Sequence, residues 1–340
     1  MARERSRRDF LTQIGAAAAG VVFTGVTTPG CHAEPQATDA QPPKSAPRVV
    51  IARDEKLTRG KVSEHGELLG KLLDASMQKL TNAADAAAAW RQLFTPKDRV
   101  GIKVNTLGLS TQPAVVEALV AGLRQAGVPA ENIIIWDRLD YELGEAGFKL
   151  NKSSRGVQCR GTDADRTDRG GGYQQRIESS GQIGSWFSRI VAEQVDTLIS
   201  VPVLKDHNLP GVSLGMKNFY GAIHNPNKYH DNNCDPYIVD VVSHRYIRPK
   251  WRLTVCDGTR AQYNAGPGVH PGFAWAFGGL IVSTDFVAAD AVAADLLEAQ
   301  RKRKGLKSLA EEGRPPKHIA TAAARGLGVA DLSKIERVEV

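Results

Sequence analysis

The chain has 340 residues, of which 42% are hydrophobic, and its formal net charge is +7. This length and apolar content predict one large globular α/β domain or two small ones, with enough apolar material for a buried core. Four cysteines in 340 residues exclude a disulfide scaffold, and the body of the chain has no charge-poor apolar run of about 20 residues that could serve as a transmembrane anchor.

The first 33 residues have the layout of an export signal. Four arginines fall within residues 3–8, and a short apolar stretch rich in Ala and Gly follows over residues 14–26. A basic segment before a short apolar one is the order of a signal peptide, and the run SRRDFL resembles a twin-arginine signal. We therefore expect the twin-arginine translocase to export the chain to the periplasm, with cleavage after Ala33. Lipid anchoring at Cys31 is the alternative.

The segment that follows the signal is predicted to be a tether. Residues 34–47 are rich in Pro, Ala and polar side chains and have no hydrophobic periodicity, which indicates disorder. Removal of residues 1–33 takes away four of the 44 basic residues and two of the 37 acidic ones, which leaves a net charge of +5. Such a small surplus, without a basic stripe, argues against a nucleic-acid partner.

From residue 48 to residue 340, short apolar runs alternate with segments of helical periodicity. Strands are predicted over residues 48–53, 99–105, 132–137, 196–203, 252–257, 279–284 and 335–340. Helices are predicted over residues 68–80, 83–93, 113–126, 141–146, 186–194, 285–303 and 317–325, and a polar insert covers 151–184. Near-continuous apolar strands that alternate with helices indicate a single three-layer α/β domain, in which a mostly parallel sheet has helices on both faces.

Polar side chains follow most of these strands, and ligands of open α/β sheets bind beyond the carboxyl ends of the strands. Lys103 lies inside an apolar strand near its carboxyl end, where a lysine must reach solvent, pair with an acid or bind an anion. Lys205 comes directly after another such strand. Asp257 and Asp285 also follow strands, although the first is equally well explained as a turn residue and the second as a helix cap.

The segment 205–236 is the richest in chemically active side chains, and the first interpretation of it is an anion site. In this interpretation lysines from distant parts of the chain hold a small carboxylate or phosphate, and a histidine transfers a proton because imidazole titrates near neutral pH. The predicted clamp is Lys103, Asn105, Lys205, Lys217 and Asn218. The proton-transfer candidates are His207 and His224, with Asp206 or Asp257 as orienting partners.

The second interpretation is a metal-binding or redox accessory protein. His224, His230, Cys234 and Asp235 would then hold a divalent metal as the cofactor, although their spacing matches no standard zinc pattern. A third interpretation is a non-catalytic binding module that uses the same lysines. The chain has no C-x-x-C motif, so we expect no ferredoxin-type iron-sulfur cluster. Whether Cys159 and Cys234 pair in an oxidising compartment is left open by the sequence.

Several of these segments carry a resemblance to a known family. VGIKVNTLG at 100–108, the lysine-histidine block at 201–236, LTVCDGTR at 253–260 and STDFVAAD at 283–290 resemble the bacterial family catalogued as domain of unknown function 362. The resemblance implies export by the twin-arginine route, which is common in the family, and implies no specific activity. Some members carry ferredoxin-type clusters, whose ligands this chain lacks. Phe286 stands where the family usually has proline.

Overall fold

The computed structural model of the protein describes residues 46–165 and 171–340. The predicted signal peptide and almost all of the predicted tether lie outside these residues, as do residues 166–170 of the predicted insert. Everything else in the predicted α/β domain is described. Within the described ranges, no helix is both long and apolar enough to cross a membrane.

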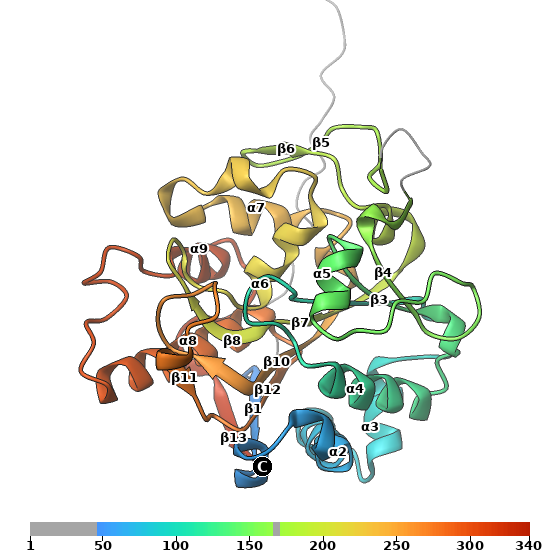
Figure 1. The fold of residues 1–340 in the computed structure, drawn as a ribbon, viewed down its shortest axis with the longest axis horizontal. Helices are drawn as coiled ribbons and strands as arrows, with labels where there is room; N and C mark the ends of the chain where they lie inside the picture. The colour runs from blue at the N-terminus through green and yellow to red at the C-terminus, as the bar shows by residue number, and fades with distance from the viewer. Residues whose placement is uncertain (1–45, 166–170) are drawn as a thin grey trace, which may run out of the picture. The chain divides into compact units, whose positions relative to one another are not determined.

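Eleven of the described strands form one mixed sheet, whose main order is β13-β1-β12-β10-β7-β2-β3-β4 (Figure 1). The strands are β1 (Arg48–Arg53), β2 (Val100–Val104), β3 (Ile133–Asp137), β4 (Gln158–Gly161), β7 (Thr197–Val201), β8 (Val203–His207), β9 (Gly211–Val212), β10 (Trp251–Gln262), β11 (Ala274–Trp275), β12 (Gly279–Ser283) and β13 (Glu336–Glu339). β8 and β11 pair with β10, and β9 pairs with β8. All seven strands predicted from the sequence are present in this sheet.

The middle of the sheet is parallel, and one strand near its end is reversed. β10, β7, β2, β3 and β4 run in one direction, whereas β12 is antiparallel to both β10 and β1. The carboxyl end of β12 therefore lies at the opposite edge from the carboxyl ends of the parallel strands. Of the two interpretations of Asp285, the helix cap is confirmed, because its side chain accepts hydrogen bonds from the Val287 and Ala288 amides at the start of the next helix.

Alternate strand residues enter two separate cores, one on each face of the sheet. In β12, Ile281 belongs to one core, whereas Leu280 and Val282 belong to the other, as the two-residue period of a strand requires. The helices that pack into the second core are α2 (Gly66–Thr81), α3 (Ala86–Leu93), α4 (Pro113–Gln125) and α5 (Asp140–Glu145). Those of the first core are α6 (Gly215–Asn218), α7 (Tyr237–Ser243), α8 (Phe286–Arg303) and α9 (Lys317–Ala324). The predicted three-layer α/β fold is confirmed.

The predicted strand 196–203 continues past a proline as a second strand. β7 ends at Val201, and Pro202, which has no N–H to donate, separates it from β8. The long strand β10 pairs with β7 near Thr254 and with β8 from Asp257 onward. Residues 205–207, which we expected to follow the end of this strand, are therefore strand residues. Their side chains alternate between the two faces of β8, which separates residues 205 and 207 from residue 206.

The predicted insert 151–184 contributes to the sheet. Its strand β4 pairs in parallel with β3 at the end of the sheet order, and β5 (Glu178–Ser180) forms a separate hairpin with β6 (Ile183–Ser185). The helix predicted over 186–194 is a shorter π-helical turn over Ile190–Gln194. Strands of three or four residues in a polar context produce too little periodicity to be recognised from the sequence.

Candidate functional site

A cavity of about 130 Å³ lies where the carboxyl ends of β2, β3 and β8 meet. All five residues of the predicted anion clamp line it, and His207 lines it with them. The three lysines come from β2, β8 and α6, so that only the parallel arrangement of the sheet brings them together. The three lysines lie together at one edge of the sheet, as we predicted.

Lys103 is buried, and each of its three ammonium hydrogens has an acceptor. Its Nζ lies 2.7 Å from Asp137 Oδ1, 2.6 Å from Val104 O and 3.2 Å from Asn218 Oδ1. Burial lowers the pKa of Lys103, and the charge of Asp137 opposes this effect. Gly221 leaves room for the ion pair, because a Cβ there would lie 2.7 Å from Asp137 Oδ1. The charge of Lys103 is thus balanced inside the protein, and its hydrogens are all in use.

Lys205 is fully buried, and three oxygens of one neighbouring loop surround its amine. Nζ lies 2.9 Å from Asn105 Oδ1, 2.5 Å from Leu107 O and 2.8 Å from Leu109 O. In the described part of the chain it has no ion-pair partner. Burial lowers the pKa of Lys205 to about 7. Three oxygen acceptors match the three hydrogens of an ammonium group, so Lys205 fixes the loop after β2 and adds an unbalanced charge to the cavity.

Lys217 is the lysine of the cavity whose hydrogens are least used. Its Nζ lies 3.2 Å from His230 Nε2 and 3.9 Å from the centre of the Tyr220 ring. Among residues 46–165 and 171–340 it has no carboxylate partner. Burial lowers the pKa of Lys217 to about 8. An ammonium group here keeps two hydrogens for a ligand in the cavity.

His230 is held as a proton acceptor toward the cavity. Its Nδ1 lies 3.0 Å from Pro226 O, and because a carbonyl oxygen can only accept, Nδ1 carries the hydrogen. Nε2 is then unprotonated and accepts a hydrogen bond from Lys217. Burial and the charge of Lys217 both lower the pKa of His230. The neutral ring therefore presents a basic nitrogen beside the Lys217 amine.

His207 is held in the opposite tautomer. Its Nδ1 accepts a hydrogen bond of 3.1 Å from the Leu209 amide, so the ring hydrogen is on Nε2. Burial, together with the nearby charge of Lys217, lowers the pKa of His207 to about 2. The two rings lie 6.3 Å apart between centroids. His207 is thus a neutral hydrogen-bond donor, whereas His230 is an acceptor in the same cavity.

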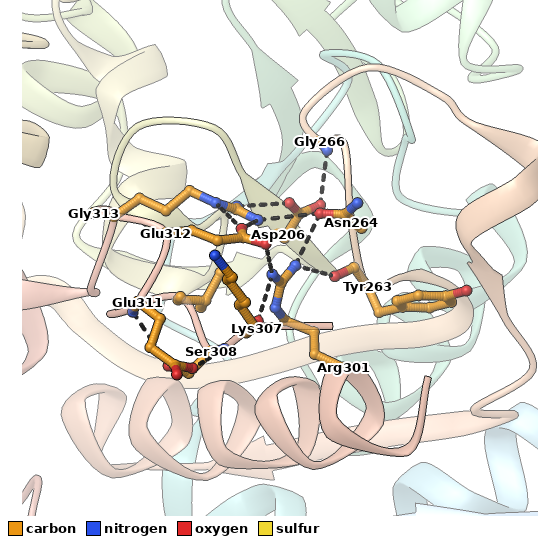
Figure 2. A network of polar contacts seen from close by, with 12 residues as sticks. Asp206, Tyr263, Asn264, Gly266, Arg301, Lys307, Ser308, Glu311, Glu312 and Gly313 are labelled. Carbon is orange, nitrogen blue, oxygen red and sulfur yellow. Dashed lines mark hydrogen bonds and ion pairs between the residues drawn. The ribbon is translucent and has the colours of Figure 1, made fainter. Parts of the chain in front are cut away.

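The predicted role of Asp206 as the orienting partner of His207 is not supported by its position, because its side chain is on the other face of β8. It accepts hydrogen bonds from the Gly266 amide and from Arg314, whose Nη1 lies 2.8 Å from Asp206 Oδ2. Figure 2 shows Asp206 beside Asn264 and Gly266, with the buried Arg301 and the exposed Glu312 next in the same network. This network holds the loop that carries Pro267 against the cavity.

Two other predicted residues, Asp257 and His224, do not line the cavity. Asp257 is buried and accepts hydrogen bonds from the Gln112 amide at 2.8 Å and from Thr259, so that it connects β10 to the start of α4. His224 is exposed, and its ring packs against Tyr173 and Trp186. The roles proposed for these two residues in proton transfer are not supported by their positions.

The predicted metal ligands His224, His230, Cys234 and Asp235 do not gather into one site. Nowhere in the described ranges do three His, Cys, Asp or Glu side chains form a group that could hold a metal ion. Cys234 is a buried free thiol, and Cys159 is another, so these two residues are not joined. His230 faces the lysine cavity instead. Metal binding by this chain stays a prediction.

Sequence reasoning missed several residues of the cavity. Asp137 and Arg138 line it, and their position at the carboxyl end of a predicted strand was a signal that could have found them. Glu142 and Tyr220 also line it, and no pattern in the sequence points to either. His230 was considered only as a metal ligand, because the sequence does not show that its Nε2 lies beside an amine.

The family model described as Domain of unknown function (DUF362) matches residues 100–295. This chain belongs to the DUF362 family. The matched range contains all three cavity lysines, His207 and His230, so the resemblance noted in the sequence is confirmed where the cavity lies. No curated protein is similar enough to the chain to count as a relative.

The opposite tautomers of the two histidines in this DUF362 protein can be tested by nuclear magnetic resonance. With ¹⁵N-labelled imidazoles, we expect His207 to carry its hydrogen on Nε2 and His230 on Nδ1. Because the pKa of His207 is lowered to about 2, its signals should not move between pH 5 and pH 8. The variants His207→Gln and His230→Gln assign the signals. A His207 ring that titrates within this interval would contradict the assignment.

Proposed function

We propose that this DUF362 protein binds a small anion, a carboxylate or a phosphate, in the lysine cavity and transfers a proton to or from it. The observation that carries the proposal is the charge of the cavity: three lysine amines line it, and among the described residues only Lys103 has a carboxylate partner. Positive charge that is buried without a counterion is costly, and a bound anion would balance it.

The remaining charges of the cavity support an anionic ligand. Arg138 and Glu142 line the cavity as well, so its positive side chains outnumber the carboxylates of Asp137 and Glu142. Lys217 offers hydrogens that no protein oxygen uses, and His207 offers its Nε2–H. Charge-assisted hydrogen bonds of this kind are the strong ones in anion recognition.

The size of the cavity limits the ligand. Its volume is about 130 Å³, and an apolar cavity of roughly 150 Å³ in another protein accommodates benzene. By this comparison the ligand has about six non-hydrogen atoms, which suits phosphate or a carboxylate of two or three carbons. Pockets for drug-sized ligands are larger, on the order of 300–1,000 Å³.

The two histidines supply the proton-transfer part of the proposal. His230 Nε2 can take a proton, and His207 Nε2–H can stabilise negative charge that develops on an oxygen of the ligand. A base and a donor that face the same small cavity are the groups needed to remove a hydrogen from carbon next to a carbonyl group.

Anion binding is tested by calorimetric titration of the folded protein with acetate and with phosphate. Lys217→Met removes one charge-assisted hydrogen bond, worth about 1.5–3 kcal/mol, so we expect affinity to fall roughly 10- to 100-fold. The control is Lys228→Met, which removes the same charge from an exposed neighbouring position and should change affinity less than about twofold. If neither anion binds the unchanged protein, the proposal is wrong.

Proton transfer is tested by the exchange of pyruvate methyl hydrogens for deuterium in D₂O, followed by proton magnetic resonance. Hydrogens next to a ketone are acidic enough for an imidazole to remove. We expect exchange above the buffer rate, and a loss of about 10²- to 10⁴-fold of that enhancement in His230→Gln. His224→Gln is the matched control, since His224 is exposed outside the cavity. If the protein binds anions but does not catalyse hydrogen exchange, it is a binding module and the proton-transfer part of the proposal is wrong.

We also propose that the chain is exported by the twin-arginine route, on the basis of its N-terminal sequence. Replacement of Arg7 and Arg8 by lysine should retain the protein in the cytoplasm, because the translocase reads this pair. Cell fractionation measures this result. The mass of the exported form distinguishes cleavage after Ala33 from lipid attachment at Cys31. Export that is unaffected by the double replacement would contradict the route.

A further inference from the structure

The Lys217 amine differs from the other two amines of the cavity in its surroundings. Every hydrogen of Lys103 and of Lys205 faces an oxygen acceptor of the protein, so both amines are fully occupied by structural contacts. Lys217 has one nitrogen acceptor and an aromatic ring as its polar contacts. When Lys217 loses a proton, no oxygen acceptor loses its hydrogen bond. When Lys205 loses a proton, one of its three oxygen acceptors does.

Burial favours the neutral form of Lys217, whereas the Cys234 thiol, when it is charged, favours the ammonium form. The charge of Lys217 in turn lowers the pKa of Lys205, His207, His230 and His318, so the positive form of Lys217 lies among groups that carry no compensating negative charge. Burial lowers the pKa of Lys217 to about 8. A desolvated lysine without a carboxylate partner is the form that reacts as a nucleophile.

We propose that Lys217 forms an imine with a small 2-oxo carboxylate that binds in the cavity. This inference rests on the proposed function, since the carboxylate of the ligand must first be held there. It narrows the ligand class from small anions in general to those that carry a carbonyl group next to the carboxylate. Such molecules begin at five non-hydrogen atoms, a size that the cavity volume permits.

The neighbouring histidines provide the proton transfers that imine formation requires. The Nζ lone pair forms a bond to the carbonyl carbon, and the carbonyl electron pair moves to oxygen, where His207 Nε2–H donates a hydrogen bond. His230 Nε2, 3.2 Å from Nζ, takes protons from nitrogen and returns them to oxygen. Both amine hydrogens end on that oxygen, which leaves as water, and a carbon-nitrogen double bond remains. The step needs no oxidant or reductant.

Reductive trapping tests the inference on the intact folded protein. Incubation with pyruvate or glyoxylate and sodium cyanoborohydride should convert the imine to a stable secondary amine, seen as one added carboxyalkyl group per chain by mass spectrometry. Peptide mapping should place this group on Lys217 and leave Lys103 and Lys205 unmodified. Acetate, which binds but has no ketone or aldehyde, should slow the trapping. The trapping rate should rise with pH through about 8 as the Lys217 amine loses its proton.

Variants separate the role of each residue. Lys217→Met should abolish the adduct, Lys228→Met should leave it unchanged, and His230→Gln should slow its formation at least tenfold while acetate still binds. Modification that is spread over exposed lysines, or that persists in Lys217→Met, would overturn the inference. Acetate binding without any adduct on Lys217 of the unchanged protein would also overturn it, and the proposed anion site would stand. If the unchanged protein neither binds acetate nor forms the adduct on Lys217, both the proposed anion site and the proposed imine are wrong.

Discussion

The architecture of the site depends on the burial of the Lys205 amine. A lysine in the interior of a protein needs an acceptor for each hydrogen, because a buried charge without hydrogen-bond partners strongly destabilises the folded state. Asn105, Leu107 and Leu109 supply these acceptors from one short loop. That loop therefore has its shape because of a residue about 100 positions later in the chain, and its shape closes one side of the cavity.

The same strand carries a second buried charge on its other face. Asp206 pairs with Arg314 and accepts from the Gly266 amide, and through Asn264 this cluster reaches Arg301. Consecutive residues of β8 thus fix two loops that meet at Pro267 and Leu109. Since successive side chains of a strand point to opposite faces, one strand can hold both walls of a cavity without contributing Asp206 to the cavity itself.

The three lysines are chemically unlike, although the sequence presents them alike. Lys103 is balanced by Asp137, Lys205 is saturated by loop oxygens, and Lys217 lies against a histidine and an aromatic ring. Hydrogen counting, more than total charge, separates a structural lysine from one that can meet a ligand. The histidines follow the same logic, because the partner of each Nδ1 decides whether its Nε2 accepts or donates.

The sequence by itself determined the α/β fold class, all seven of the strands expected in the sheet, and the lysines that meet at its edge. Apolar periodicity and the position of a polar residue after a strand are local features, and local features can be recognised directly in the amino-acid sequence. Only the tertiary structure decided that β12 runs backward, that Asp206, Asp257 and His224 stay outside the cavity, and that His230 is inside it. Strand direction, the identity of hydrogen-bond acceptors and the tautomer of a ring depend on residues far apart in sequence, and no local pattern encodes them.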